Sequence, residues 1–186
     1  QKGKAPDLTR HSVTIFAEIV DAPDLSIEQI VAKAEHFRQQ GADVIDLGCL
    51  PGKSFDHMPA AIHALKAVGF QVSVDSMRDE DLLAAGKAGA DFLLSLHEKN
   101  LWIADEVAAT PILIPTRPAN TASLTRAIEQ CLKRGRRFIA DPILDPIHFG
   151  LTDSIVRYHK LRKRYPDIQI MMGVGNLTEL TDADTT

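Results

Sequence analysis

Gln71-Val72-Ser73-Val74-Asp75-Ser76 is a short β-branched run that ends in a carboxylate. It is followed at once by Met77-Arg78-Asp79-Glu80-Asp81, a pattern typical of the start of a helix. The two segments together predict that Asp75 lies where a buried strand opens into a loop. In α/β enzymes the loops at the carboxyl ends of strands carry the chemistry, so this stretch indicates both a fold class and a candidate site.

Polar residues end other predicted strands in the same way. Because parallel strands of one sheet or barrel end at the same edge, we expect these side chains to share one polar pocket with Asp75. The polar strand ends are Glu18, Asp46, Ser95, Thr116, Asp141 and Asn176.

Composition indicates one globular domain over residues 1–186. The 186-residue chain is 45% hydrophobic and 25% charged, which is enough for one core and too little for two comfortable domains. The net charge is -4, and the two basic runs, 133–137 and 160–164, lie near predicted helix ends, where cations complement the helix dipole. We therefore do not expect nucleic acid as a partner.

Cysteine usage and the N-terminus favour a cytoplasmic protein. Cys49 and Cys131 lie far apart with no second pair, which argues against a disulfide scaffold or a zinc site. Residues 1–6 lack the hydrophobic core of a signal peptide, and no apolar run approaches the roughly 20 residues of a membrane span. No membrane partner is expected. Gln1 in place of Met suggests a piece of a longer protein.

Strands and helices alternate along the chain. The pattern of 41–46, a helix-ending glycine that leads into a strand, is repeated at 89–95. Regular alternation without hairpin signals favours a (β/α)8 TIM-barrel-like fold over an open doubly wound sheet. About seven units are present, so part of the barrel wall is expected to be missing, replaced or contributed by another chain. The predicted strands are 13–20, 42–48, 71–75, 89–95, 111–115, 138–141 and 168–174, and the later helices are 102–109, 121–134 and 154–165.

Four short motifs resemble those of the pterin-binding TIM-barrel superfamily, which includes dihydropteroate synthases and pterin-dependent corrinoid methyltransferases. The chain looks most like the dihydropteroate synthase-related proteins of methanopterin-making organisms, above all in residues 171–180. The motifs are Asp46-Leu47-Gly48, Ser73-Val74-Asp75-Ser76, Asp141-Pro142 with His148-Phe149-Gly150, and Gly173-Val174-Gly175-Asn176.

The resemblance implies that Asp75 and Asp141 hold a pterin ring and that Asn176 adds a hydrogen bond to it. A pterin presents its 2-amino and ring N–H groups as a donor edge, which a carboxylate can accept with both oxygens. The alternative is that each aspartate caps the helix after its strand. Asp79 and Ser76 could cap in place of Asp75, and Pro142 argues against a cap at Asp141.

Two cations are candidates for a substrate anion. Asp46 precedes Gly48, where the backbone can approach a ligand closely. In the family the following loop handles the diphosphate of the substrate, which points to Lys53 here. Arg117, after the fifth strand, is the second candidate. The alternatives are a solvated lysine and a surface salt bridge.

Several positions depart from the synthase pattern. Glu18 with Asp21 is closer to the methyltransferases, Ser95 replaces the usual asparagine of the fourth strand, and Asn176 lies where the synthases carry a lysine. These departures argue against synthase catalysis but do not argue against pterin binding.

No cofactor is firmly indicated. His97 and His148 are the best placed histidines, because each lies on a loop after a strand, and His148 is the candidate for substrate binding. Asp141, Asp145 and His148 are candidates to gather Mg²⁺ beside a diphosphate.

The favoured function is a transferase of the dihydropteroate synthase type, which couples a pterin-methyl diphosphate to an arylamine in folate or tetrahydromethanopterin biosynthesis. A pterin-dependent methyltransferase, a non-catalytic pterin-binding module and an unrelated TIM-barrel enzyme remain the alternatives. The expected partners are the pterin and arylamine substrates, with a homodimer as a further expectation.

Overall fold

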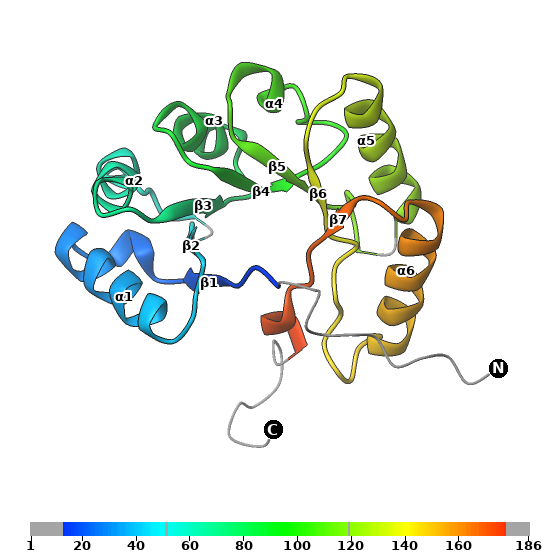
Figure 1. Ribbon diagram of the computed structural model, residues 1–186, viewed down its shortest axis with the longest axis horizontal. Helices are drawn as coiled ribbons and strands as arrows, with labels where there is room; N and C mark the ends of the chain where they lie inside the picture. The colour runs from blue at the N-terminus through cyan, green and yellow to red at the C-terminus, as the bar shows by residue number, and fades with distance from the viewer. Residues whose placement is uncertain (1–12, 51, 119, 178–186) are drawn as a thin grey trace.

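The computed structural model describes residues 13–50, 52–118 and 120–177. Seven parallel strands alternate with helices, and Figure 1 shows the helices on the outer side of a curved sheet. The strands are β1 Phe16–Ile19, β2 Val44–Gly48, β3 Gln71–Asp75, β4 Phe92–Leu96, β5 Thr110–Leu113, β6 Ile139–Ala140 and β7 Gln169–Ile170. The helices are α1 Ile27–Gln39, α2 Met58–Ala67, α3 Asp79–Lys87, α4 Ile103–Glu106, α5 Thr121–Lys133 and α6 Leu151–Arg164, with 3-10 helices η2 Ala22–Asp24 and η3 Val174–Leu177.

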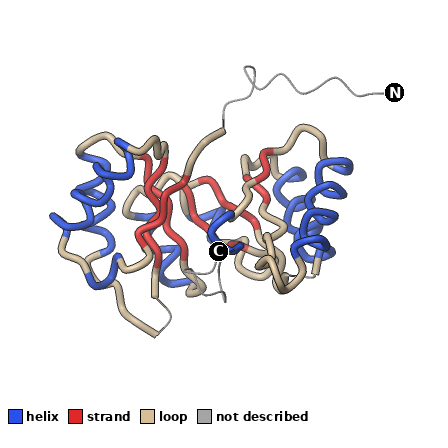
Figure 2. Tube along the Cα trace, turned by 90° about the horizontal axis from the view of Figure 1, so that it is seen from below, coloured by secondary structure: helices blue, strands red, loops and turns tan. Residues whose placement is uncertain are grey.

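The sheet is an incomplete barrel. Its strand order is β1-β2-β3-β4-β5-β6-β7, and every neighbouring pair is parallel. Within the described residues β1 and β7 are not paired with each other, so the sheet stays open there. The second view shows the strands between groups of helices on either side (Figure 2). A doubly wound sheet would carry helices on both faces. The prediction of a TIM-barrel-like fold with about seven units is confirmed.

Side chains of β2 and β3 alternate between two environments. Ile45 and Leu47 lie in register with Val72 and Val74, and all four are fully buried in the apolar core. The intervening residues point to the other face of the sheet, because successive side chains of a strand alternate. The pairs on that face are Asp46 with Ser73 and Gly48 with Asp75. The register therefore places polar groups inside the barrel.

Local sequence signals explain the helix ends. Ser26 caps α1: its hydroxyl accepts from the Gln29 amide at 3.3 Å, and the Gln29 side chain accepts from the Ser26 amide at 2.8 Å. Gly41 and Gly89 have φ values of 100° and 92°, the left-handed backbone that ends a helix. The predicted role of both glycines is confirmed.

Several predicted boundaries were wrong. β7 covers two residues instead of 168–174, because residues 174–177 form η3, and α4 is shorter than 102–109. β1 is shorter than 13–20, and α6 begins at Leu151 rather than at 154. β6 ends before Asp141-Pro142, since proline has no N–H to donate to a ladder.

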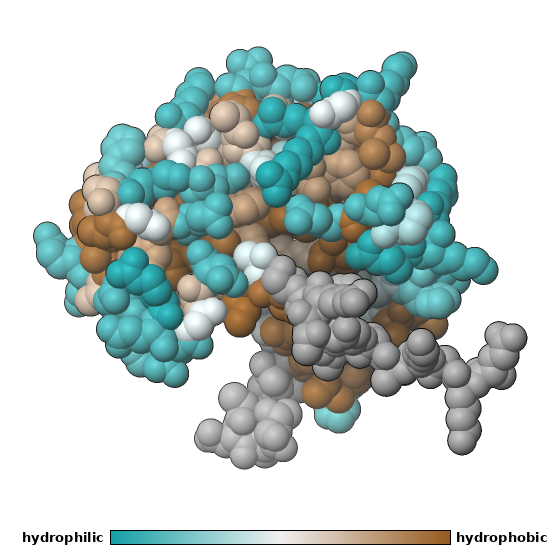
Figure 3. Space-filling view, viewed as in Figure 1, coloured by the Kyte–Doolittle hydropathy of each residue, from teal (hydrophilic) through white to brown (hydrophobic). Residues whose placement is uncertain are grey.

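Polar side chains cover most of the helical rim on the face in Figure 3, and apolar side chains gather toward its centre and lower part. Ile15, Met172 and Val174, which flank β1 and β7, are 49%, 45% and 63% exposed. None of the helices in the described ranges is long and apolar enough to cross a membrane.

Replacing Gly86 with alanine should destabilise the protein, although alanine is the better helix former. A Cβ at Gly86 of α3 would lie 2.7 to 2.8 Å from three side-chain carbons of Val107, whose β-branched side chain cannot turn away freely. We expect Gly86→Ala to lower the free energy of unfolding by about 1–3 kcal/mol in urea denaturation.

The control is the pair Val107→Ala and Gly86→Ala/Val107→Ala. The double variant should be no less stable than Val107→Ala alone, because the clash is gone. A Gly86→Ala protein as stable as the parent would contradict this account of the α3 packing.

Candidate functional site

Asp75 is the last residue of β3 and faces the barrel interior. The Ser95 hydroxyl of β4 donates to Asp75 Oδ1 at 2.5 Å. Burial raises the pKa of Asp75 above its ordinary value, and the hydrogen bond from Ser95 works in the opposite direction. Ser95 has a φ of 67°, which is uncommon for a residue other than glycine.

Asp141 directly follows β6 and is 9% exposed. Its Oδ1 accepts two hydrogen bonds, from the Tyr158 hydroxyl of α6 at 2.7 Å and from the Ile143 amide at 2.7 Å. Burial raises the pKa of Asp141, the two hydrogen bonds lower it, and the negative charge of Asp75 raises it. The charges of Asp75 and Asp141 therefore act on each other across the barrel.

Asp46 and Ser73 lie opposite each other one layer deeper. Asp46 is 4% exposed and Ser73 is fully buried, and neither Asp46 Oδ1 nor Ser73 Oγ has a hydrogen-bond partner among the described residues. Burial raises the pKa of Asp46 to about 8, with further contributions from the charges of Asp75 and Glu18. At neutral pH this shift favours the protonated form of Asp46.

Glu18 reaches the same place from β1. It is in register with Asp46, and its Oε1 lies 2.5 Å from the position that a Cβ at Gly48 would take. Gly48 thereby leaves space for the Glu18 carboxylate at the end of β2. Glu18, Asp46, Asp75 and Asp141 form the group of acidic side chains that we call the carboxylate cluster.

Two predicted site residues are engaged elsewhere. Lys33 of α1 donates to Asp21 Oδ1 at 2.8 Å, which draws Asp21 toward that helix. Lys53 forms an ion pair with Asp24 of η2. The ammonium group of Lys53 is thus partly neutralised on the surface.

Arg117 and His148 are exposed residues of the loops after β5 and β6. Asn176 lies in η3, and the Ile147 amide donates to the neighbouring Leu177 carbonyl at 3.2 Å. This bond joins η3 to the loop that begins at Asp141, and no hydrogen bond links Asn176 itself to Asp75 or Asp141 within the described residues.

The loop after β6 is held by Arg157 of α6. The guanidinium donates to the Ile143 carbonyl at 2.8 Å and to Asp145 Oδ2 at 2.8 Å. Asp145 therefore has a cationic partner already. No group of three or more His, Cys, Asp or Glu side chains in the described ranges is arranged to hold a metal ion, so Asp141, Asp145 and His148 do not form the expected Mg²⁺ site in this structure.

Sequence reasoning missed Tyr158, Arg157 and the pairing of Ser73 with Asp46. The spacing of Ser154, Tyr158 and Leu161, which are all buried on α6, marks the inner face of that helix. A tyrosine on such a face needs a partner for its hydroxyl, which is the signal that could have revealed Tyr158.

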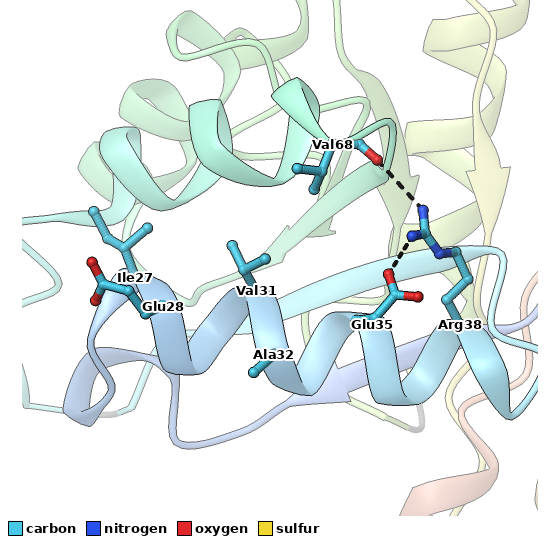
Figure 4. Close-up of a pocket in the computed structure, with 7 residues that line it drawn as sticks. All are labelled: Ile27, Glu28, Val31, Ala32, Glu35, Arg38 and Val68. Carbon is cyan, nitrogen blue, oxygen red and sulfur yellow. Dashed lines mark hydrogen bonds and ion pairs between the residues drawn. The ribbon is translucent and has the colours of Figure 1, made fainter.

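A groove of about 560 Å³ lies outside the barrel, between α1 and the end of α2. Figure 4 shows Arg38 at one end of it, where the guanidinium donates to the Val68 carbonyl and contacts Glu35. Ile27, Val31 and Val68 supply its apolar surface. None of the carboxylate cluster lines this groove, and we do not assign the candidate site to it.

Comparisons with known proteins agree with the barrel fold. No protein-family model matches the chain. An uncharacterized protein of Methanocaldococcus jannaschii is 28% identical over 204 residues, which cover 98% of this chain and 38% of the relative. The chain thus spans less than half the length of that relative.

Solved dihydropteroate synthases share the fold. The enzyme of Coxiella burnetii in complex with pteroic acid has a TM-score of 0.67 and 20% identity, over 90% of this chain and 76% of that one. The enzyme of Xanthomonas albilineans in complex with 7,8-dihydropteroate has a TM-score of 0.67 and 19% identity, over 90% and 75%. The enzyme of Vibrio fischeri has a TM-score of 0.66 and 17% identity, over 90% of this chain and 76% of that one. The chain therefore shares the TIM-barrel-like fold of these dihydropteroate synthases.

The buried acid Asp46 should make stability depend on pH. Its pKa is about 8 in the folded protein against an ordinary value of 3.8, so the folded state binds this proton more tightly than the unfolded state. The resulting stability is fully present below the ordinary value and is lost as the pH rises toward 8. Between pH 6 and 8 we expect the free energy of unfolding to fall by up to about 1.4 kcal/mol per pH unit.

Asp46→Asn should flatten this dependence in urea denaturation at several pH values, because the amide does not titrate. Asp167→Asn, on the exposed segment after α6, is the matched control and should keep the slope of the parent. Equal slopes in the parent and in Asp46→Asn would show that Asp46 does not titrate in this range.

Proposed function

We propose that this domain binds a pterin in the barrel mouth and acts as a dihydropteroate synthase-like transferase, joining a pterin-methyl diphosphate to an arylamine. One observation carries the proposal: the half-buried Asp75 at the end of β3 and the buried Asp141 directly after β6 are each hydrogen-bonded through Oδ1. The fold shared with the dihydropteroate synthases supports it.

The carboxylates suit a flat heterocycle with several N–H donors. Each carboxylate has about four acceptor sites, and only one oxygen of each is used by the hydrogen bonds from Ser95, Ile143 and Tyr158. A pterin offers its 2-amino and ring N–H groups to the other oxygens. Charge-assisted hydrogen bonds of this kind are stronger than neutral ones, and burial excludes the water that would compete with them.

The proposed reaction is a displacement at the CH2 group of the pterin. The arylamine nitrogen forms the new C–N bond while the C–O bond to diphosphate breaks, the diphosphate leaves with the electron pair, and the amine loses a proton to solvent. The protein positions the two reactants and balances the charge that develops on the leaving group. Arg117 is better suited to this last role than Lys53, because Lys53 is paired with Asp24.

A non-catalytic pterin-binding module is the second candidate. The Lys53–Asp24 ion pair favours it, because that pair occupies the cation of the loop in which a diphosphate site is expected. The two candidates predict the same pterin pocket and differ only in diphosphate release.

Asp75→Asn and Asp141→Asn should weaken pterin binding, because each amide presents an NH2 group, with two N–H donors, where the carboxylate had only acceptors. We expect a loss of affinity of about 10- to 100-fold for pteroic acid, measured by quenching of pterin fluorescence. Asp167→Asn is the surface control and should bind like the parent. Unchanged affinity in both site variants would place the pterin elsewhere or exclude it.

Incubation with a dihydropterin-methyl diphosphate and 4-aminobenzoate separates the synthase from the binding module. The synthase releases diphosphate and forms 7,8-dihydropteroate, and Arg117→Gln should slow this reaction more than it weakens pteroic acid binding. Tight pterin binding with no release of diphosphate by the parent protein would contradict the synthase and support the module.

A further inference from the structure

Two residues other than glycine have a positive φ in the described ranges, and both contact the proposed pterin-binding carboxylates. They are Ser95 with a φ of 67° and Ile143 with a φ of 63°. This backbone conformation is unfavourable for residues with a Cβ and is an outlier for a β-branched residue such as isoleucine. Strained residues of this kind persist where the surrounding structure fixes them, often at functional sites.

We infer that Ser95 and Tyr158 are positioning residues that hold Asp75 and Asp141 through Oδ1 and so present Oδ2 of each carboxylate to the donor edge of a ligand. The inference rests on the proposed pterin site and deepens it. It assigns to Ser95 a role through Asp75 instead of a direct contact with the substrate.

The backbone conformation of Ser95 interrupts the regular pairing of β4 with β5 at the point where the Ser95 hydroxyl contacts Asp75. The register of β4 against β5 shifts between Leu93 and Leu96, around Ser95. A regular strand residue would keep the ladder hydrogen bonds in place. The left-handed backbone instead brings the Ser95 hydroxyl to Asp75 Oδ1, 20 residues earlier in the chain. In the described part of the chain all hydrogen bonds to this carboxylate fall on Oδ1.

Asp141 is held in an equivalent way from two directions. The positive φ of Ile143 accompanies an amide that donates to Asp141 Oδ1 at 2.7 Å, while Arg157 binds the Ile143 carbonyl from the other side at 2.8 Å. The Tyr158 hydroxyl, on a side chain that is 8% exposed, donates to the same Oδ1 at 2.7 Å. Burial raises the pKa of Tyr158, so its hydroxyl keeps the proton that it donates.

The hydroxyls of Ser95 and Tyr158 also affect the ionisation of Asp75 and Asp141. The charge of Asp75 raises the pKa of both Asp46 and Asp141, while Asp141 accepts from Tyr158, and the nearby charges of Arg157 and Asp145 act on Tyr158 in opposite directions. In this acidic surrounding burial and like charges favour protonated carboxyl groups, and the hydroxyl donors favour the ionised form. Removal of a hydroxyl should therefore raise the pKa of its carboxyl partner.

The first test is the pH dependence of pteroic acid binding in Ser95→Ala and Tyr158→Phe. If the ligand needs ionised carboxylates, affinity falls as the pH drops through their pKa values. We expect both variants to bind about tenfold more weakly near neutral pH and to show the acid-side midpoint at higher pH. Tyr165→Phe, which removes a hydroxyl that donates to Glu129 on the surface, is the matched control and should follow the parent.

Two further variants separate positioning from a structural role. Ser95→Gly relieves the strained backbone and removes the hydroxyl, so we expect a higher melting temperature together with the binding defect of Ser95→Ala. Ser95→Asn tolerates the left-handed conformation and supplies an N–H donor, so it should restore most of the affinity. Parent-like binding by Ser95→Gly would overturn the positioning role of Ser95.

A titration of the ligand-free protein distinguishes failure of this inference from failure of the proposed function. Carboxyl ¹³C chemical shifts report the pKa of Asp75 in Ser95→Ala and of Asp141 in Tyr158→Phe without any pterin. Upward shifts in both variants support the positioning roles even if the parent binds no pteroic acid, which would overturn only the pterin site. Titration curves identical to the parent would overturn the positioning roles even if pteroic acid binds.

Discussion

Parallel pairing in sequential order is the constraint on which the rest of the structure depends. Each strand runs in the same direction, so each delivers its last residues to one edge of the sheet. Residues separated by dozens of positions along the chain, such as Asp46, Asp75 and Asp141, become electrostatic neighbours without any long loop to connect them. The apolar alternate residues of β2 and β3 fix the register, because a slip by one residue would turn Val72 and Val74 into the barrel and Asp75 out of it.

The same constraint creates an electrostatic cost, since these acidic side chains repel one another and are wholly or partly removed from solvent. The protein meets this cost differently at each position. Asp46 avoids it by keeping its proton, which the raised pKa of about 8 allows at neutral pH. Asp75 and Asp141 receive hydroxyl and amide donors instead, and these stabilise the charged form. Burial thus raises the pKa of all three acids, and the donors hydrogen-bonded to Asp75 and Asp141 oppose this effect.

The sequence was sufficient for those features that depend on local patterns. The β-branched run before Asp75 predicted β3. Gly41 and Gly89 predicted the ends of two helices, and the regular alternation of strands and helices predicted the parallel barrel. Pairings between side chains far apart in the chain could not be predicted, because no local pattern encodes them. Lys53 with Asp24, Asp21 with Lys33 and Tyr158 with Asp141 all depend on how the completed barrel brings its loops and helices together. The strands β6 and β7 were predicted, but their lengths were overestimated, since an apolar run does not reveal where a ladder stops.

The uneven ends of the sheet bear on how molecules of this domain meet in solution. An edge strand displays unpaired backbone donors and acceptors that can recruit a strand of a second molecule, and proteins restrain such edges by keeping them short. β7 is only two residues long and so offers little template for such recruitment. The short β7 therefore limits how far this end of the sheet could be extended by a strand of a second molecule.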